Sequence, residues 1–405
     1  MTLYLYSSLF LIILFLFYLR RTSSTLFAPA AFLAVKTSVP VIISSFVSIN
    51  FISVGVSSID YTYIISFASL LAICLGYVIY PTRALYSFHN LFARFLNQLS
   101  LLNFKQKLLS SVLFLVLAVF FILAKSNFSP KWITNPREAY ETLRLGIGVF
   151  YAIATWSLVL LYCTALFRFK PYKVRSMLIY SLIFSFLSLF SGSKGLVASI
   201  IIISILYCHL FVRPLGFLWL LFVALAPVLG VPVLNLLLGS AYDLNLNYFQ
   251  YFNSTASLVE AFQNKSLPHF SGLITIENRI YSLFPSSMFG TSNIFGIYRL
   301  HEFLNPGKLE LGRATGTLFW ASYFADAGLI GVFVASFSIG FLLRFYVSVF
   351  NLFASFNPLL FILYIQFCWF DAFNYAEHLA IVPLIFILSL CGFLGRPYLP
   401  RLITV

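Results

Sequence analysis

The sequence predicts an all-α, polytopic integral membrane protein of about eleven transmembrane helices with one large outer loop. Two observations carry this prediction. Of the 405 residues, 61% are hydrophobic and only 9% are charged, which leaves too little polar surface for a soluble globule. The charges are also unevenly placed: all 11 Asp and Glu residues fall on one side of the predicted membrane, whereas short basic islands separate the apolar runs on the other.

The basic islands fix the orientation of the chain. Lys and Arg residues in short loops face the cytoplasm under the positive-inside rule, and no island contains an acidic residue. The net charge of +14 therefore reflects membrane topology and gives no indication of nucleic acid binding. The islands comprise Arg20, Arg21, Arg83, Arg94, Lys105, Lys107, Arg168, Lys170, Lys173, Arg175, Arg213, Arg344, Arg396 and Arg401.

Apolar runs of spanning length, about 17 to 25 residues, predict the individual spans. An odd number of spans and a cytoplasmic carboxyl terminus place the very short amino terminus outside. A secretory signal has basic residues before its apolar core, whereas Arg20 and Arg21 follow the first run, which is therefore interpreted as a retained span. The predicted spans are 3–19, 27–49, 62–80, 108–124, 147–167, 174–190, 195–211, 217–237, 319–342, 349–370 and 378–394.

The chain is interpreted as one membrane domain, residues 1–405, with a small outer loop at 125–146 and a large one at 238–318. An amphipathic helix on the inner leaflet is predicted near Arg83 and Arg94. Its apolar residues recur at helical spacing: Leu85, Phe88, Phe92, Phe95 and Leu99. Four aromatic residues of the large loop suit either sugar stacking or an interfacial aromatic belt, namely Tyr248, Phe249, Tyr251 and Phe252.

The sequence gives no indication of a metal, a cofactor or a disulfide framework. All five cysteines lie within apolar runs, and no Cys/His cluster has metal-binding spacing. A phosphate-binding P-loop, a Gly-rich dinucleotide motif and a nucleophile elbow are also lacking. We therefore do not expect this chain to use ATP through any motif of its own.

Three short motifs carry a family resemblance. They are the turn Ser191-Gly-Ser-Lys-Gly195, the segment Glu277-Asn-Arg-Ile-Tyr281, and Gly312-Arg-Ala-Thr-Gly316 leading into Phe324-Ala-Asp-Ala-Gly-Leu-Ile-Gly331. Together with basic inner loops and a large outer loop late in the chain, they resemble the oligosaccharide repeat-unit polymerases of the O-antigen polymerase (Wzy) type. The likeness extends over about 350 residues and is one of layout plus these motifs.

The resemblance implies an integral-membrane, GT-C-like glycosyltransferase in the bacterial inner (cytoplasmic) membrane, with its active site facing the periplasm. Donor and acceptor would both be undecaprenyl-diphosphate-linked oligosaccharides, held among membrane lipids. The donor is already activated, so no nucleotide sugar, metal or cofactor is expected. A chain-length regulator and a flippase are the protein partners that the resemblance implies.

Three residues are candidates for catalysis. Arg279 and Arg313 lie in the large outer loop, and a guanidinium group presents a rigid fork of donors that suits diphosphate oxygens; the alternative is an ordinary solvated arginine. Asp326 lies just inside the ninth span, where an ionised carboxylate is costly unless it finds a partner or water. It would orient an arginine or accept the proton of the acceptor hydroxyl, or be a helix-start acid favoured by the helix dipole.

Five further residues are candidates for substrate binding. Lys194 lies in a tight turn at the interface, and Arg144 lies near the span that follows the small outer loop. Arg299 and His301 belong to the large loop, where His301 and Glu302 are also possible proton acceptors. Lys36 is the one basic residue well inside a span, so it is expected to pair within the bundle or to line a wet cavity.

Two other functions compete with polymerisation. An O-antigen ligase would use the same donor and leaving group but transfer the chain to lipid A core. A flippase or transporter of lipid-linked sugars belongs to a different class, in which short loops, related halves and several charges inside the spans are typical. Only Lys36 fits that pattern here, and an outer loop of this size is not needed for it.

Overall fold

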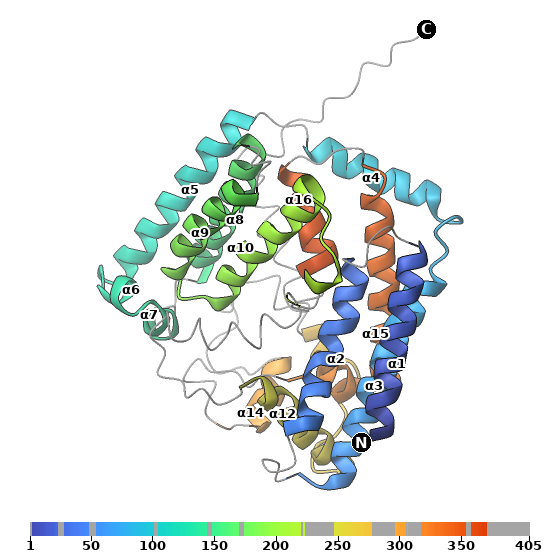
Figure 1. The fold of residues 1–405 in the computed structure, drawn as a ribbon. Helices are drawn as coiled ribbons and strands as arrows, with labels where there is room; N and C mark the ends of the chain where they lie inside the picture. The colour runs from blue at the N-terminus through green and yellow to red at the C-terminus, as the bar shows by residue number, and fades with distance from the viewer. Residues whose placement is uncertain are drawn as a thin grey trace. The chain divides into compact units, whose positions relative to one another are not determined.

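In the computed structural model, every regular element among the described residues is helical (Figure 1). This confirms the predicted helical class. The described residues are 2–22, 28–47, 54–100, 104–143, 148–169, 174–219, 222, 247–277, 296–304, 306, 317–353 and 358–370.

The chain divides into two compact lobes. The first lobe contains the described residues within Met1–Tyr80 and Pro214–Arg344, together with Phe370. Its helices are α1 (Thr2–Thr22), α2 (Pro29–Val47), α3 (Val56–Ile79), α12 (Asn247–Gln263), α14 (Ile297–Leu304) and α15 (Ala321–Phe350) as far as Arg344. Within it, α1, α2 and α3 pack against one another, and α12 packs against α2 and α3.

The second lobe contains the described residues within Pro81–Arg213 and Phe345–Trp369. Its helices are α4 (Tyr86–Ser100), α5 (Phe104–Lys125), α6 (Lys131–Thr134), α7 (Pro136–Leu143), α8 (Gly148–Phe169), α9 (Val174–Leu189), α10 (Lys194–Tyr207) and α16 (Pro358–Tyr364). Two π-helical segments, Cys208–Val212 and Ile365–Phe370, continue α10 and α16. Helix α8 packs against α5, α10 and α16.

Most of the predicted spans coincide with helices. The first seven correspond to α1, α2, α3, α5, α8, α9 and α10 with its π-helical extension, and the ninth corresponds to α15. Two of the described helices, Val56–Ile79 and Ala321–Phe350, are long and apolar enough by length and composition to cross a membrane. The eighth span, apart from residues 217–219 and 222, and the eleventh lie outside the described residues.

The predicted start of the tenth span is wrong. Residues 349–350 still belong to α15, a turn follows at Asn351, and the next helix begins only at Pro358. No Gly or Pro interrupts α15 after Gly340, so Arg344 continues the helix instead of ending it. The Arg344 Nη1 donates to the Tyr77 hydroxyl at 3.1 Å, and its guanidinium lies 5.0 Å from the Tyr77 ring centroid.

Helices α3 and α15 approach closely through glycine. An ideal Cβ built on Gly76 would lie 2.1 Å from the Phe337 carbonyl oxygen, and one on Gly340 would lie 2.0 Å from the Ile73 carbonyl oxygen. The hydroxyl groups of Ser69 and Ser336, both buried, hydrogen bond at 2.8 Å in the same crossing. Small residues let two helix backbones approach closely. A hydrogen bond between hydroxyl groups holds the helices together in apolar surroundings, where no hydrophobic driving force favours their association.

The region predicted as the large outer loop, residues 238–318, contributes part of the hydrophobic core of the first lobe. Helix α12 buries Phe252, Val259 and Phe262 in a cluster with Tyr63 and Trp320. Phe252 has no exposed surface and its ring centroid lies 5.0 Å from that of Tyr63. Phe252 is therefore a core residue, and sugar stacking is excluded for it.

The predicted amphipathic helix is present as α4. Phe88, Leu91 and Phe95 lie exposed on one face, whereas His89 and Leu96 are buried on the other. The exposed aromatic side chains line an apolar hollow of about 370 Å³ together with Phe92. An exposed apolar face beside Arg83 and Arg94 is the arrangement expected of a helix at a membrane surface.

Candidate functional site

A break in α15 positions the site. Ala327 and Gly328 have non-helical backbone angles, with a φ of 61° and a ψ of −149° at Gly328. This conformation is readily adopted only by glycine. The first turns of α15 end at Asp326, which is buried with 4% of its surface exposed, and the longer apolar part follows the break.

The Asp326 carboxylate binds the start of a helical turn formed by residues 273–277. Its Oδ1 accepts from the Ile274 N–H at 2.9 Å, and its Oδ2 accepts from the Thr275 N–H at 2.8 Å and from the Thr275 hydroxyl. The first N–H groups of a helix lack partners within it, and their dipole favours an anion. Asp326 therefore anchors a segment of the predicted large loop that is about fifty residues away in the sequence.

Backbone contacts hold the same segment against the break. The Phe270 N–H donates to the Ala325 carbonyl at 3.0 Å, and the Ser271 N–H donates to the Asp326 carbonyl at 2.9 Å. Ser271 and Gly272 both have positive φ values, 53° and 89°, which turn the chain back toward residues 273–277. The segment is thus fixed by main-chain and side-chain bonds.

The other end of the turn carries an ion pair. Glu277 is 9% exposed and accepts two hydrogen bonds at 3.0 Å from Nε and Nη2 of Arg299, together with one at 2.6 Å from the Gly296 N–H. Burial raises the pKa of Glu277, but the bonds from Arg299 and Gly296 and the Arg299 charge outweigh it, so the pKa lies below its ordinary value. The pair fixes the start of α14, because Gly296 and Arg299 lie at that end.

We expect Glu277→Gln to lower the free energy of unfolding by about 1.5 to 3 kcal/mol, since hydrogen bonds to charged groups contribute this much. A lowered folded-state pKa adds stability above the unfolded value, near 4.5, and this stability is lost as pH falls through the folded value. The wild-type advantage in thermal stability over Glu277→Gln should therefore shrink in acid. Glu138→Gln, whose pair with Lys131 is about half exposed, should change little. Equal losses in both variants would contradict the expectation.

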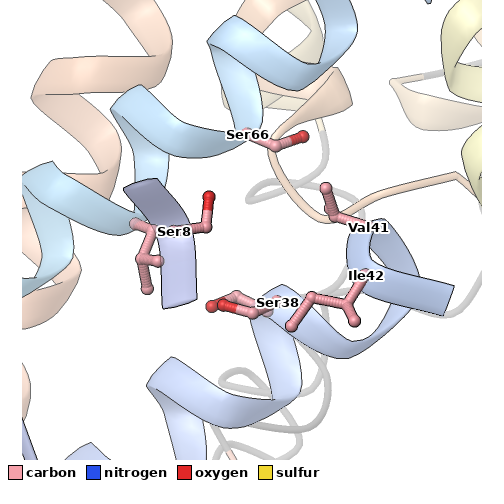
Figure 2. A pocket seen from close by; sticks show the side chains of 7 residues that line it. Ser8, Ser38, Val41, Ile42 and Ser66 are labelled. Carbon is pink, nitrogen blue, oxygen red and sulfur yellow. The ribbon is translucent and has the colours of Figure 1, made fainter. Parts of the chain in front are cut away.

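A small cavity lies among α1, α2 and α3 (Figure 2). Its volume is about 10 Å³, close to what one buried water needs. The Thr37 and Ser38 hydroxyls both donate to the Ala34 carbonyl, and the Ser66 hydroxyl donates to the Thr62 carbonyl, so their oxygen lone pairs are left for the cavity. Lys36, the predicted basic residue within a span, immediately precedes Thr37 and is partly exposed. The residues that line the cavity are Ser8, Thr37, Ser38, Val41, Ile42, Ser66 and Leu70.

Ser191, Gly192 and Ser193 of the predicted turn motif lie in the turn between α9 and α10 in the second lobe. Lys194 was predicted to lie in this turn, but the structure places Lys194 and Gly195 in the first turn of α10, because Ser193 caps the helix. Gly192 has a φ of 66°, and an ideal Cβ there would lie 2.2 Å from the Pro136 carbonyl oxygen. The Ser193 side chain caps α10 by accepting from the Leu196 N–H, and the Tyr151 hydroxyl donates to the Ser191 carbonyl at 3.0 Å. The glycine at the second position of the motif is thus explained by packing against the small outer loop.

The structure brings two of the predicted site residues into one network. Asp326 holds the first N–H groups of residues 273–277, and Glu277 at the end of that turn holds Arg299. Arg279, Arg313 and Arg144 lie outside the described residues. Lys194 and His301 lie in α10 and α14, but their side chains are outside the description.

Two residues that the sequence did not single out for function belong to this site. The sequence analysis named Glu277 only as part of a motif. The basic residues Arg279 and Arg299 nearby in the sequence could have suggested that Glu277 forms an ion pair. His269 follows Pro268 in the large loop, and its ring packs against the break in α15. Its position in the loop that also contains the candidate arginines could have identified His269 as a site residue from the sequence.

None of the protein-family models, curated proteins or solved structures compared with this chain matches it.

Proposed function

We propose that this protein polymerises undecaprenyl-diphosphate-linked oligosaccharide repeat units into O-antigen or a related surface polysaccharide at the periplasmic face of the bacterial inner membrane. The supporting observation is the anchored outer segment. Asp326, just before the break in a helix long enough to cross a membrane, holds residues 273–277, and Glu277 binds Arg299. Residues 273–277, which precede Arg279 in the sequence, are therefore held beside this break.

The proposed reaction joins a sugar hydroxyl of one lipid-linked unit to the anomeric carbon of the growing chain. A carbon–oxygen bond forms to the acceptor, the bond to the lipid diphosphate breaks, and negative charge develops on the departing diphosphate. Catalysis then requires orientation of two lipid-linked substrates and stabilisation of that charge. Membrane lipid, a flippase that delivers the units and a chain-length regulator are the proposed partners.

The contacts of Arg299 and Asp326 support the following assignment of residue roles. Arg299 is paired with Glu277 and its charge is balanced, so the diphosphate contacts are assigned to Arg279 and Arg313. Both oxygens of Asp326 already accept bonds, so Asp326 is assigned as a positioning residue instead of a proton acceptor. Lys194, Arg144, Lys36 and His301 remain candidates for contacts with the substrate.

Reconstitution tests the activity directly. Purified protein in vesicles that contain the lipid-linked repeat unit is expected to make polymer with a chelator present and without any nucleotide, because the diphosphate already activates the donor. Complete inactivation by the chelator that added metal reverses would contradict metal independence. A heat-treated sample and vesicles without protein provide the controls.

Deletion of the gene distinguishes the alternatives in the cell. Gel analysis of the surface polysaccharide should show core that carries a single repeat unit if the chain is the polymerase. Unsubstituted core with polymer retained on the carrier lipid would identify a ligase. Repeat units that accumulate on the cytoplasmic leaflet would identify a flippase.

A further inference from the structure

The His269 side chain contacts the residues that precede the break in α15. Its Nδ1 lies 3.2 Å from the Ala325 carbonyl oxygen, and its ring stacks on Phe262 with centroids 4.7 Å apart and planes 10° from parallel. The Phe324 ring meets it edge-on at 5.8 Å. These three contacts hold the imidazole in one orientation.

The contact with Ala325 also selects a tautomer. A carbonyl oxygen only accepts, so Nδ1 donates its proton to it, and in the neutral form of the imidazole the lone pair is then on Nε2. Nε2 has no hydrogen-bond partner among the residues that the structure describes, and the His269 side chain is exposed. A neutral imidazole fixed through Nδ1 with an accessible Nε2 is the form that accepts a proton.

Gly328 lies beside this nitrogen. An ideal Cβ at Gly328 would lie 3.7 Å from Nε2 and 3.6 Å from the Cε1 of His269, which is ordinary van der Waals contact with the imidazole edge. Glycine at this position places no side chain against that edge. The two acids of the anchored network are engaged elsewhere: Asp326 by Ile274 and Thr275, and Glu277 by Arg299.

We propose that His269 is a catalytic residue that accepts the proton of the acceptor sugar hydroxyl, an inference that rests on the proposed polymerase function. As the acceptor oxygen bonds to the anomeric carbon, its proton passes to Nε2, and the electron pair of the breaking bond leaves with the lipid diphosphate. The imidazolium then returns the proton to solvent. The Ala325 carbonyl, fixed within α15, stabilises the imidazolium through Nδ1–H.

Two substitutions separate proton transfer from packing. His269→Asn supplies a side-chain N–H in place of Nδ1 and preserves the bond to Ala325, but it removes Nε2. His269→Ala removes the whole ring and leaves a space beside Phe262 for free imidazole. In the reconstituted assay, both variants should lose about 100-fold or more in kcat, as expected for removal of a general base, with little change in KM.

Rescue of activity is the decisive readout. Added imidazole should restore polymerisation by His269→Ala at least several-fold and should not stimulate the wild type, a result that lost packing alone would not give. Lys265→Asn is the matched control, because Lys265 is exposed in the same loop and asparagine tolerates its positive φ of 56°. This variant should polymerise at the wild-type rate.

The outcomes keep the two proposals apart. If the wild type makes no polymer, the proposed function fails whatever the variants do. If the wild type makes polymer and His269→Asn retains its full rate, the polymerase function stands and the role of His269 is overturned. Loss of activity in His269→Ala without imidazole rescue, at unchanged thermal stability, would also overturn the role in proton transfer.

Discussion

Replacement of either Arg279 or Arg313 by alanine is expected to reduce polymerisation about 100- to 1,000-fold, the usual effect of removing one donor from developing transition-state charge. Both arginines belong to the predicted large outer loop, and Arg279 follows the anchored Glu277 by two residues. The expected products in cells are single repeat units on core, at normal membrane abundance of the variant. The length distribution of the surface polysaccharide measures the effect.

Lysine replacements test the geometry of the same contact. Lysine keeps the positive charge but lacks the planar fork that binds two oxygens at once, so Arg279→Lys and Arg313→Lys should restore activity only partly. Lys308→Ala, in the same loop, provides the control and should leave chain length unchanged. Full-length polymer from both alanine variants, at wild-type abundance, would show that these arginines are merely solvated.

The helices were predictable from the sequence because they depend on local composition. Apolar runs such as 3–19 and 108–124 correspond to α1 and α5, since long apolar segments must satisfy their backbone groups internally. The boundary predicted near residue 349 failed because a basic residue, Arg344, was interpreted as marking a loop. In the structure, Arg344 interacts with Tyr77 from within a continuous helix.

The content of the large outer loop was only partly predictable. It was predicted only as a loop of one membrane domain, but Phe252, Val259 and Phe262 recur at helical spacing and lie buried in the core of the first lobe. The aromatic residues were interpreted as suited to sugar stacking or to an interfacial aromatic belt. Their helical spacing was the better guide, because it indicates a helix with one buried face.

The partners of the site residues could not be predicted from the sequence. The sequence indicated that an ionised Asp326 within a span needs a partner. Its hydrogen-bond donors include the backbone N–H groups of Ile274 and Thr275, which lie 52 and 51 residues away in the sequence. The ion pair between Glu277 and Arg299 joins residues that are 22 positions apart in the sequence. Pairing at such separation is set by tertiary packing, which a single sequence does not encode in any local pattern.

The crossing of α3 and α15 leads to the largest expected effect on stability. Any side chain at Gly340 would place a Cβ within 2.0 Å of the Ile73 carbonyl oxygen, and the neighbour is backbone, so it cannot turn aside. Gly340→Val should therefore force the two helices apart and break the bond between Ser69 and Ser336. Overpacking costs about 1 to 3 kcal/mol and sometimes more, and a rigid backbone contact belongs at the upper end.

We expect Gly340→Val to abolish accumulation of folded protein in the membrane, and Gly340→Ala and Gly76→Ala to lower the thermal unfolding temperature. Fluorescence-detected size-exclusion chromatography after heating measures both. Gly216→Val is the matched control, because no atom of the described residues lies within 4 Å of an ideal Cβ at Gly216. If Gly340→Val were as abundant and as heat-stable as Gly216→Val, the close approach of α3 and α15 would not hold this lobe together. A loss confined to the Gly340 and Gly76 variants would show that glycine at both positions is required because the two backbones touch there.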